Sequence, residues 1–295
     1  MIVAQFGIEY EPRLVEAAVL ASVTGRAEER PFLSERERLF EIADAEAREA
    51  AFRDLHARWF ERLRLDRPFT VALEELPEIA ARCERCLVTR GTTAGDQSAD
   101  LRVAPGRPPV VLVRVLPETV AASERLLRFL RGELLHVADM LDPRFAYARS
   151  LPRAGAGGPE DRLLAERYRA LWDAFVDGRL MRLGRAPASV RAENLADFAR
   201  TFPGLGDRTE TEFDQFFGAR ARTHAELLAF AEGAGASSLR CPLCGFPTRT
   251  FEPAPDLLPP AVLAAITDDF PLWSPGAGLC RRCAELYRCR PAPRG

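Results

Sequence analysis

Apolar side chains recur at helical spacing along most of the chain, and this pattern predicts a largely helical protein. The first long helix is expected to begin at Ser34, which opens a capping-box pattern, and to continue to Leu65. Pro68 ends it, because proline removes a backbone N–H and clashes with the preceding turn. A second helical segment is predicted over residues 71–86, with a break or kink at Pro77.

Two short runs typical of β-strands interrupt this pattern. Residues 100–104 and 110–116 are joined by a segment rich in Pro and Gly, so a hairpin or small sheet is expected there. A strong helix follows over residues 123–141, and further helices are predicted over 160–183, 188–200 and 209–232. The predicted fold class is therefore α+β, mostly helical, with a small sheet preceding the helix at 123–141.

Two Gly-rich segments, 150–159 and 233–238, are typical of links between structured parts. We therefore expect three parts. These are an N-terminal helical region over 1–99, a central part with the sheet and its following helices over 100–238, and a small cysteine-bearing module over 239–295.

The amino-acid composition is that of an ordinary globular protein. Hydrophobic residues make up 47% of the chain and charged residues 28%, values that exclude wholesale disorder. The net charge of −2 argues against a dedicated nucleic-acid binder. Every basic residue is an arginine, which we interpret as codon bias in a GC-rich bacterial genome. Because neither a signal peptide nor a membrane-spanning run is recognisable, we expect a cytoplasmic protein with no membrane partner.

Four cysteines near the C-terminus form two Cys-x-x-Cys pairs, Cys241 with Cys244 and Cys280 with Cys283. Each pair can present two thiolates to one ion at about 2.3 Å, and two pairs complete a tetrahedron. The module resembles zinc ribbons and related treble-clef modules, which implies a structural Zn²⁺ held by four thiolates. The alternative is four buried thiols without a metal.

Three further cysteines are harder to interpret. Cys83 and Cys86 form a Cys-x-x-Cys pair with no second pair nearby, and Cys289 follows the four-cysteine set. Unliganded thiols, a second metal site and redox chemistry all stay open for them.

The helix at 123–141 carries Glu133 and His136, which lie three residues apart and therefore share a face. The run Gly132-Glu133-Leu134-Leu135-His136, preceded by a strand, resembles the His-Glu-x-x-His helix of zincin metallopeptidases over about residues 100–183. The resemblance implies that Glu133 is the general base and His136 a zinc ligand. It fails at Gly132, which stands where the first ligand histidine would be and has no side chain.

Zincin-like families often take a third ligand from a later helix, and Asp173 and Asp177 have the spacing for this. The resemblance would make Asp173 the ligand of a second Zn²⁺, and Asp177 the acceptor for the ring N–H of His136. Surface charges and a core histidine are the plain alternative.

The sequence thus predicts a cytosolic zinc-binding protein on a metallopeptidase-like scaffold whose activity is lost or altered, because Gly132 replaces a ligand. One alternative is a metal-dependent hydrolase in which Glu133 activates water. A third is a non-enzymatic adaptor whose zinc module binds a protein or peptide partner, with nucleic acid the less favoured partner.

Overall fold

The structure, a computed structural model, describes residues 6–149, 159–236, 239–248, 251–252 and 254–290. These ranges are mostly helical with one four-stranded sheet, which confirms the predicted α+β class. Most of the predicted link at 150–159 lies outside the described residues. None of the helices in these ranges is both long and apolar enough to cross a membrane.

The sheet has the order β1-β2-β4-β3. Its parallel strands are β1 (Gly7–Tyr10), β2 (Arg85–Arg90) and β4 (Val110–Val115), and β3 (Ser98–Arg102) pairs antiparallel with β4 at one edge. The predicted hairpin is therefore present as β3 and β4. Along β4 the side chains at 111, 113 and 115 are fully buried, because alternate residues of a strand face the core.

The pattern did not reveal β1 and β2. The helix predicted over 71–86 is instead α4 (Arg67–Glu74) and α5 (Pro77–Arg82), followed by β2. Pro77 occupies the first turn of α5, where its missing N–H costs nothing. The residues of β2 form a strand because both of its neighbours, β1 and β4, pair with it along the sheet.

The N-terminal helices are α1 (Pro12–Val23), α2 (Glu29–Arg38), the 3₁₀ turn η1 (Leu39–Glu41) and α3 (Ala45–Arg62). The prediction of a single helix from Ser34 to Leu65 is therefore wrong. Ser34 lies inside α2. Asp44 is the N-cap of α3, and its carboxylate accepts a hydrogen bond from the N–H of Ala47 at 2.7 Å. This side-chain cap at a new helix start explains the break.

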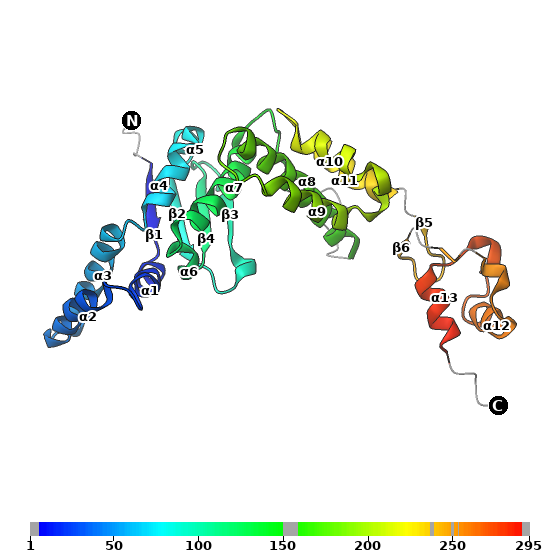
Figure 1. Cartoon of the computed structure of the whole chain (residues 1–295), viewed down its shortest axis with the longest axis horizontal. Helices are drawn as coiled ribbons and strands as arrows, with labels where there is room; N and C mark the ends of the chain where they lie inside the picture. The colour runs from blue at the N-terminus through cyan, green and yellow to red at the C-terminus, as the bar shows by residue number, and fades with distance from the viewer. Residues whose placement is uncertain (1–5, 150–158, 237–238, 249–250, 253, 291–295) are drawn as a thin grey trace.

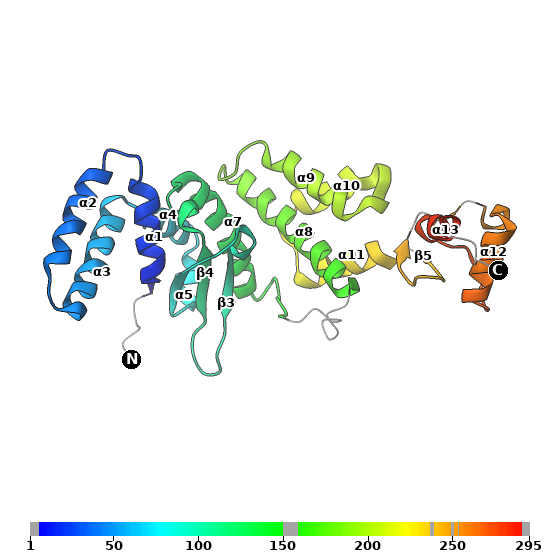
Figure 2. The same cartoon turned by 90° about the horizontal axis from the view of Figure 1, so that it is seen from below.

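The central helix α7 (Ser123–Leu141) follows the short helix α6 (Pro117–Val120) and has the predicted bounds. It packs against β3, α4 and α8 (Pro159–Arg182). Its fully buried side chains, at 126, 130, 134 and 137, follow the helical repeat. Figures 1 and 2 show α1–α3, the sheet with α7, and α8–α11 following one another along the molecule.

The next helices along the chain are α9 (Val190–Thr201), α10 (Thr209–Phe217) and α11 (His224–Ala236), with the 3₁₀ turn η3 (Pro203–Arg208) between α9 and α10. The helix predicted over 209–232 is thus two helices. The second starts with a reciprocal cap, in which the N–H of Thr223 donates to Glu226 at 2.7 Å and the N–H of Glu226 donates to the Thr223 hydroxyl at 3.2 Å.

One buried cluster extends from Leu14 to Ala231, and a second lies within residues 241–284. Residues before and after position 100 share the first core and the sheet, since β3 itself spans that position. The four-cysteine module has a core of its own.

Candidate metal centre

The first cysteine pair lies in a tight turn between β5 (Leu239–Arg240) and β6 (Pro247–Thr248). The N–H of Gly245 donates to the Cys241 carbonyl at 2.8 Å, and the N–H of Cys241 donates to the Phe246 carbonyl at 3.0 Å. Gly245 has a φ of 69°, a left-handed conformation that glycine adopts at little cost. The turn therefore holds the thiols of Cys241 and Cys244 on one side of the backbone.

The second pair comes from the start of a helix. Cys280 is the N-cap of α13 (Arg281–Arg288), and its sulfur accepts a hydrogen bond from the N–H of Cys283 at 3.4 Å. The N-terminus of a helix favours negative charge, because its free N–H groups and its dipole point there. The hydrogen bond from the Cys283 N–H lowers the pKa of the Cys280 thiol, in opposition to the larger effect of burial.

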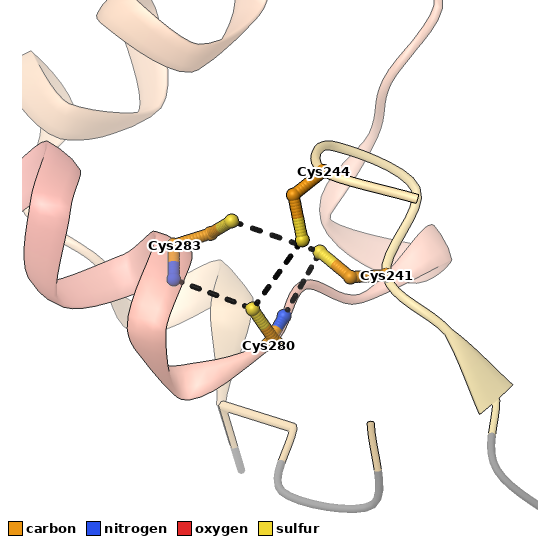
Figure 3. Close-up of side chains that lie close together, drawn as sticks. All are labelled: Cys241, Cys244, Cys280 and Cys283. Atoms are coloured by element: carbon orange, nitrogen blue, oxygen red, sulfur yellow. Dashed lines mark hydrogen bonds between the residues drawn. The ribbon is translucent and has the colours of Figure 1, made fainter. Parts of the chain in front are cut away.

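The four sulfur atoms converge (Figure 3), and all lie within 4.8 Å of one another. Cys241 Sγ is 3.9 Å from Cys283 Sγ, and Cys244 Sγ is 3.9 Å from Cys280 Sγ. A tetrahedron with Zn–S bonds of about 2.3 Å has edges of about 3.8 Å. The sulfurs are therefore spaced for one tetrahedral ion such as Zn²⁺.

The electrostatics of the site also suit a cation. Burial raises the pKa of Cys241, but N–H groups of Cys280, Cys244 and Leu243 donate hydrogen bonds to its sulfur and bring the pKa to about 7. Burial raises the pKa of Cys280 and of Cys283. A divalent ion would supply the positive charge that lets all four thiolates form together.

The long insert between the two pairs is part of the folded module. It forms α12 (Pro260–Asp269) and two 3₁₀ turns, η4 (Pro255–Leu257) and η5 (Pro275–Ala277). Ile266 and Leu279 are fully buried, and the indole N–H of Trp273 donates to the Gly278 carbonyl at 2.8 Å. The insert thus supplies the apolar core against which the cysteine turns pack.

The other cysteines do not gather around a comparable site. Burial raises the pKa of Cys83 to about 11 and that of Cys86 to about 12, so both are protonated thiols at neutral pH. Cys289 is exposed at the end of α13. Within the described ranges, the four-cysteine set is the one group of three or more Cys, His, Asp and Glu side chains close enough to share an ion.

The structure brings His136 and Asp173 together. The Nε2 atom of His136 lies 2.9 Å from the Oδ1 atom of Asp173, and the His136 side chain is only 5% exposed. The ring of Trp172 lies edge-on to the imidazole, with centroids 4.5 Å apart. The direct hydrogen bond leaves no room for an ion between this nitrogen and this oxygen, because a shared ion would lie about 2 Å from each.

Arg169, on α8, occupies the centre of this cluster. Its guanidinium donates to Glu133 at 2.6 Å and to Asp173 at 2.8 Å. The second carboxylate oxygen of Glu133 accepts the backbone N–H of Ala99, on the edge strand β3, at 2.9 Å. Both carboxylates therefore contact the same arginine, and both oxygens of Glu133 have partners.

The charges in this cluster stabilise one another. Burial raises the pKa of Asp173, but the hydrogen bonds and electrostatic interactions with His136 and Arg169 outweigh this effect, and the net pKa is lowered. Asp173 is thus held as a carboxylate within an ion-paired network.

Asp177 does not take the position expected for it. Its carboxylate accepts a hydrogen bond from the side-chain amide of Asn194 at 2.8 Å, and Asp173 is the carboxylate that contacts His136. Burial raises the pKa of Asp177. The other ring nitrogen of His136, Nδ1, is buried and has no partner among the described residues.

Two features of this region could not be derived from the sequence pattern. Asp139, one turn beyond His136, is buried and accepts hydrogen bonds from the Trp172 indole at 2.8 Å and from Arg179 at 2.8 Å. At Gly132, an added Cβ would meet no atom within 4 Å, so the position has room for a side chain. Helical spacing places Asp139 on the His136 face, but the partners come from α8.

Comparisons with known proteins found no matching family model, no matching curated protein and no matching solved structure.

Proposed function

We propose that this protein binds one Zn²⁺ through Cys241, Cys244, Cys280 and Cys283 as a structural ion, and that its zincin-like helix has lost peptidase chemistry. The observation that carries the second part is the position of Arg169 between Glu133 and Asp173. The expected activity is therefore binding rather than hydrolysis.

The four-thiolate site is suited to a structural role. Four protein ligands complete the tetrahedral coordination of zinc, so no position is left for a water or substrate. The ligands join the β5–β6 turn to the start of α13, and the surrounding core is small. In a module of this size, metal binding contributes directly to the free energy of folding.

Three features support loss of catalysis at the Glu-x-x-His helix. A catalytic zinc has three protein ligands, whereas only His136 and Asp173 stand at the corresponding positions here, since Gly132 has no side chain. The guanidinium of Arg169 supplies the positive charge that an ion would otherwise supply. Both oxygens of Glu133 are engaged, one by Arg169 and one by β3, so accepting a proton from water would compete with these contacts.

The hydrolase alternative requires Arg169 to leave its place. The side chain is 53% exposed, so its withdrawal into solvent is sterically simple, but two carboxylates would lose their counter-charge. We therefore favour the inactive form of the scaffold.

A role as an adaptor is the second candidate, and one observation favours it. Four large apolar side chains of the C-terminal module are exposed, and they are Phe246 at 57%, Leu257 at 79%, Leu272 at 102% and Leu286 at 62%. Exposed apolar groups on a small folded module favour a protein partner over nucleic acid. A reducing cytosolic setting is consistent with this, because none of the seven cysteines forms a disulfide.

Metal analysis together with a peptidase assay tests the proposal. The purified chain should contain one zinc, retain it in the variant His136→Ala, and cleave no member of a peptide library. Two zincs with one lost in His136→Ala, or cleavage abolished by Glu133→Gln, would establish the hydrolase instead.

A further inference from the structure

A cavity of about 720 Å³ lies far along the chain from the cysteine module, between the start of α1 and the helix α3. It opens at the carboxyl end of β1, where Tyr10 is followed by Glu11 and Pro12 of the α1 start. Open sheets with parallel strands bind ligands at the carboxyl ends of strands where the strand order reverses, whereas β1 is an edge strand of this sheet. The side chains that line the cavity therefore decide which ligand it could bind.

Three polar side chains of the cavity lining have buried atoms without a partner. They are the Nε2 atom of His56, the hydroxyl of Tyr10 and the Nε atom of Arg36, none of which has a hydrogen-bond partner in the described chain. His56 is only 5% exposed. A buried polar atom that lacks a partner costs free energy, so a bound molecule that supplied partners for these atoms would be stabilised at this cavity.

Aromatic rings form one wall. The rings of Phe40 and Phe52 meet edge-on with centroids 5.2 Å apart, and the guanidinium carbon of Arg36 lies 5.6 Å and 5.7 Å from their centroids. Phe40 is 58% exposed, which is unusual for a phenylalanine and leaves a flat apolar surface uncovered. A planar apolar ring fits such a surface.

Charged side chains of both signs line the cavity: the arginines Arg13, Arg36 and Arg53, and the carboxylates Glu11, Glu16, Glu49 and Asp54. Glu11 accepts the backbone N–H of Arg90, and Arg53 faces Glu49 at 3.9 Å on the exposed rim. Arg36 forms no ion pair with any described residue, although it is half-buried. Burial lowers the pKa of His56, Arg36 lowers it further, and the opposing effects of Glu16 and Glu49 are smaller than that of burial. The imidazole is therefore neutral and offers one donor and one acceptor.

We propose that this cavity binds a small aromatic carboxylate, with its ring against Phe40 and Phe52, its carboxylate on the guanidinium of Arg36, and a hydrogen bond to His56. The bidentate geometry of arginine matches a carboxylate. This site is independent of the zinc module and of the Glu133 cluster.

Titration with 2-naphthoate, followed by its fluorescence and by calorimetry, tests the proposal. A Kd of about 1 mM or tighter is expected for a ligand of this size. The variant Arg36→Met should weaken binding by about tenfold or more, because a charge-assisted hydrogen bond is lost. The control variant Arg58→Met removes an exposed arginine of α3 that does not line the cavity, and it should bind as the unaltered protein does.

The neutral analogue 2-naphthamide separates charge recognition from apolar binding, and should bind about tenfold more weakly than the carboxylate. Circular dichroism checks that each variant is folded. The absence of saturable binding to the unaltered protein would overturn the proposal. Equal binding of acid and amide, or equal binding to Arg36→Met, would also overturn it.

Discussion

The guanidinium of Arg169 lies 2.6 Å from a carboxylate oxygen of Glu133, the residue that a zincin-like peptidase would use to activate water. The same guanidinium contacts Asp173, so one arginine supplies positive charge to both carboxylates. Our proposal of a silent centre rests on this contact more than on the missing ligand at Gly132, because the arginine stabilises the carboxylates without an ion.

Loss of one thiolate should release the metal and unfold the C-terminal module. In Cys244→Ser we expect loss of about one zinc per chain, because the remaining three thiolates leave the tetrahedron open. Trp273, which is 7% exposed in the module core, should then shift its fluorescence to longer wavelength. The matched variant Cys289→Ser, an exposed cysteine outside the cluster, should keep both its zinc and its spectrum. Zinc retained in Cys244→Ser would contradict the four-thiolate site.

Acid should weaken the contribution of Asp173 to stability. Its pKa is lowered in the folded state, so the stability it contributes is present above the unfolded value of 3.8 and is lost as the pH falls through the folded value. Unfolding in urea should show Asp173→Asn to be less stable than the unaltered protein by about 1–2 kcal/mol at pH 7. The difference should shrink below about pH 4, and a difference that grows there would contradict the network.

Asp177 should contribute to stability with the opposite pH dependence to Asp173, and it serves as the control for the urea unfolding experiment. Burial raises its pKa, so ionisation costs stability as the pH rises above 3.8 through the folded value. In Asp177→Asn the new side-chain amide oxygen can still accept the hydrogen bond from Asn194. The free energy of unfolding of this variant should rise relative to that of the unaltered protein between pH 4 and pH 7. A loss of stability that is larger at pH 7 than at pH 4 would show that the charge of Asp177 is stabilising.

Restoring the missing ligand should create a second metal site once Arg169 is removed. Gly132 has room for a side chain, so Gly132→His combined with Arg169→Met places two imidazoles and Asp173 where a zincin has its ligands. We expect the double variant to bind a second zinc and Gly132→His alone to bind none, because Arg169 still holds the carboxylates. Adding His136→Ala to the double variant should abolish the second site. Failure of the double variant, once folded, to gain a metal would count against the zincin-like ancestry.

Thiol labelling distinguishes the three classes of cysteine. At pH 7.5 the zinc-loaded protein should react rapidly with iodoacetamide at Cys289 alone, because Cys83 and Cys86 are buried and have pKa values near 11 and 12. Mass spectrometry of the digested protein locates the label. Rapid labelling of Cys86 in the native protein would reopen a redox or metal role for that pair.

Much of the fold could be predicted from the sequence where the signal is local. The apolar repeat of α7 gave its bounds, and the cysteine spacing identified the four side chains whose sulfurs converge. The strands β1 and β2 could not be found, since β1 has only four residues, β2 closely follows the helical residues of α5, and the pairing of both depends on distant segments. The role of Arg169 was hidden for the same reason, because it depends on how α8 packs across α7.

We propose that the chain holds one structural zinc ion and that Arg169 takes the place of a catalytic zinc ion. Anomalous diffraction from crystals of the zinc-loaded protein, measured at the zinc absorption edge, tests both halves together. We expect a single anomalous peak among the sulfurs of Cys241, Cys244, Cys280 and Cys283, with Arg169 in contact with Glu133 and Asp173. A second peak beside His136, with Arg169 turned away, would contradict it.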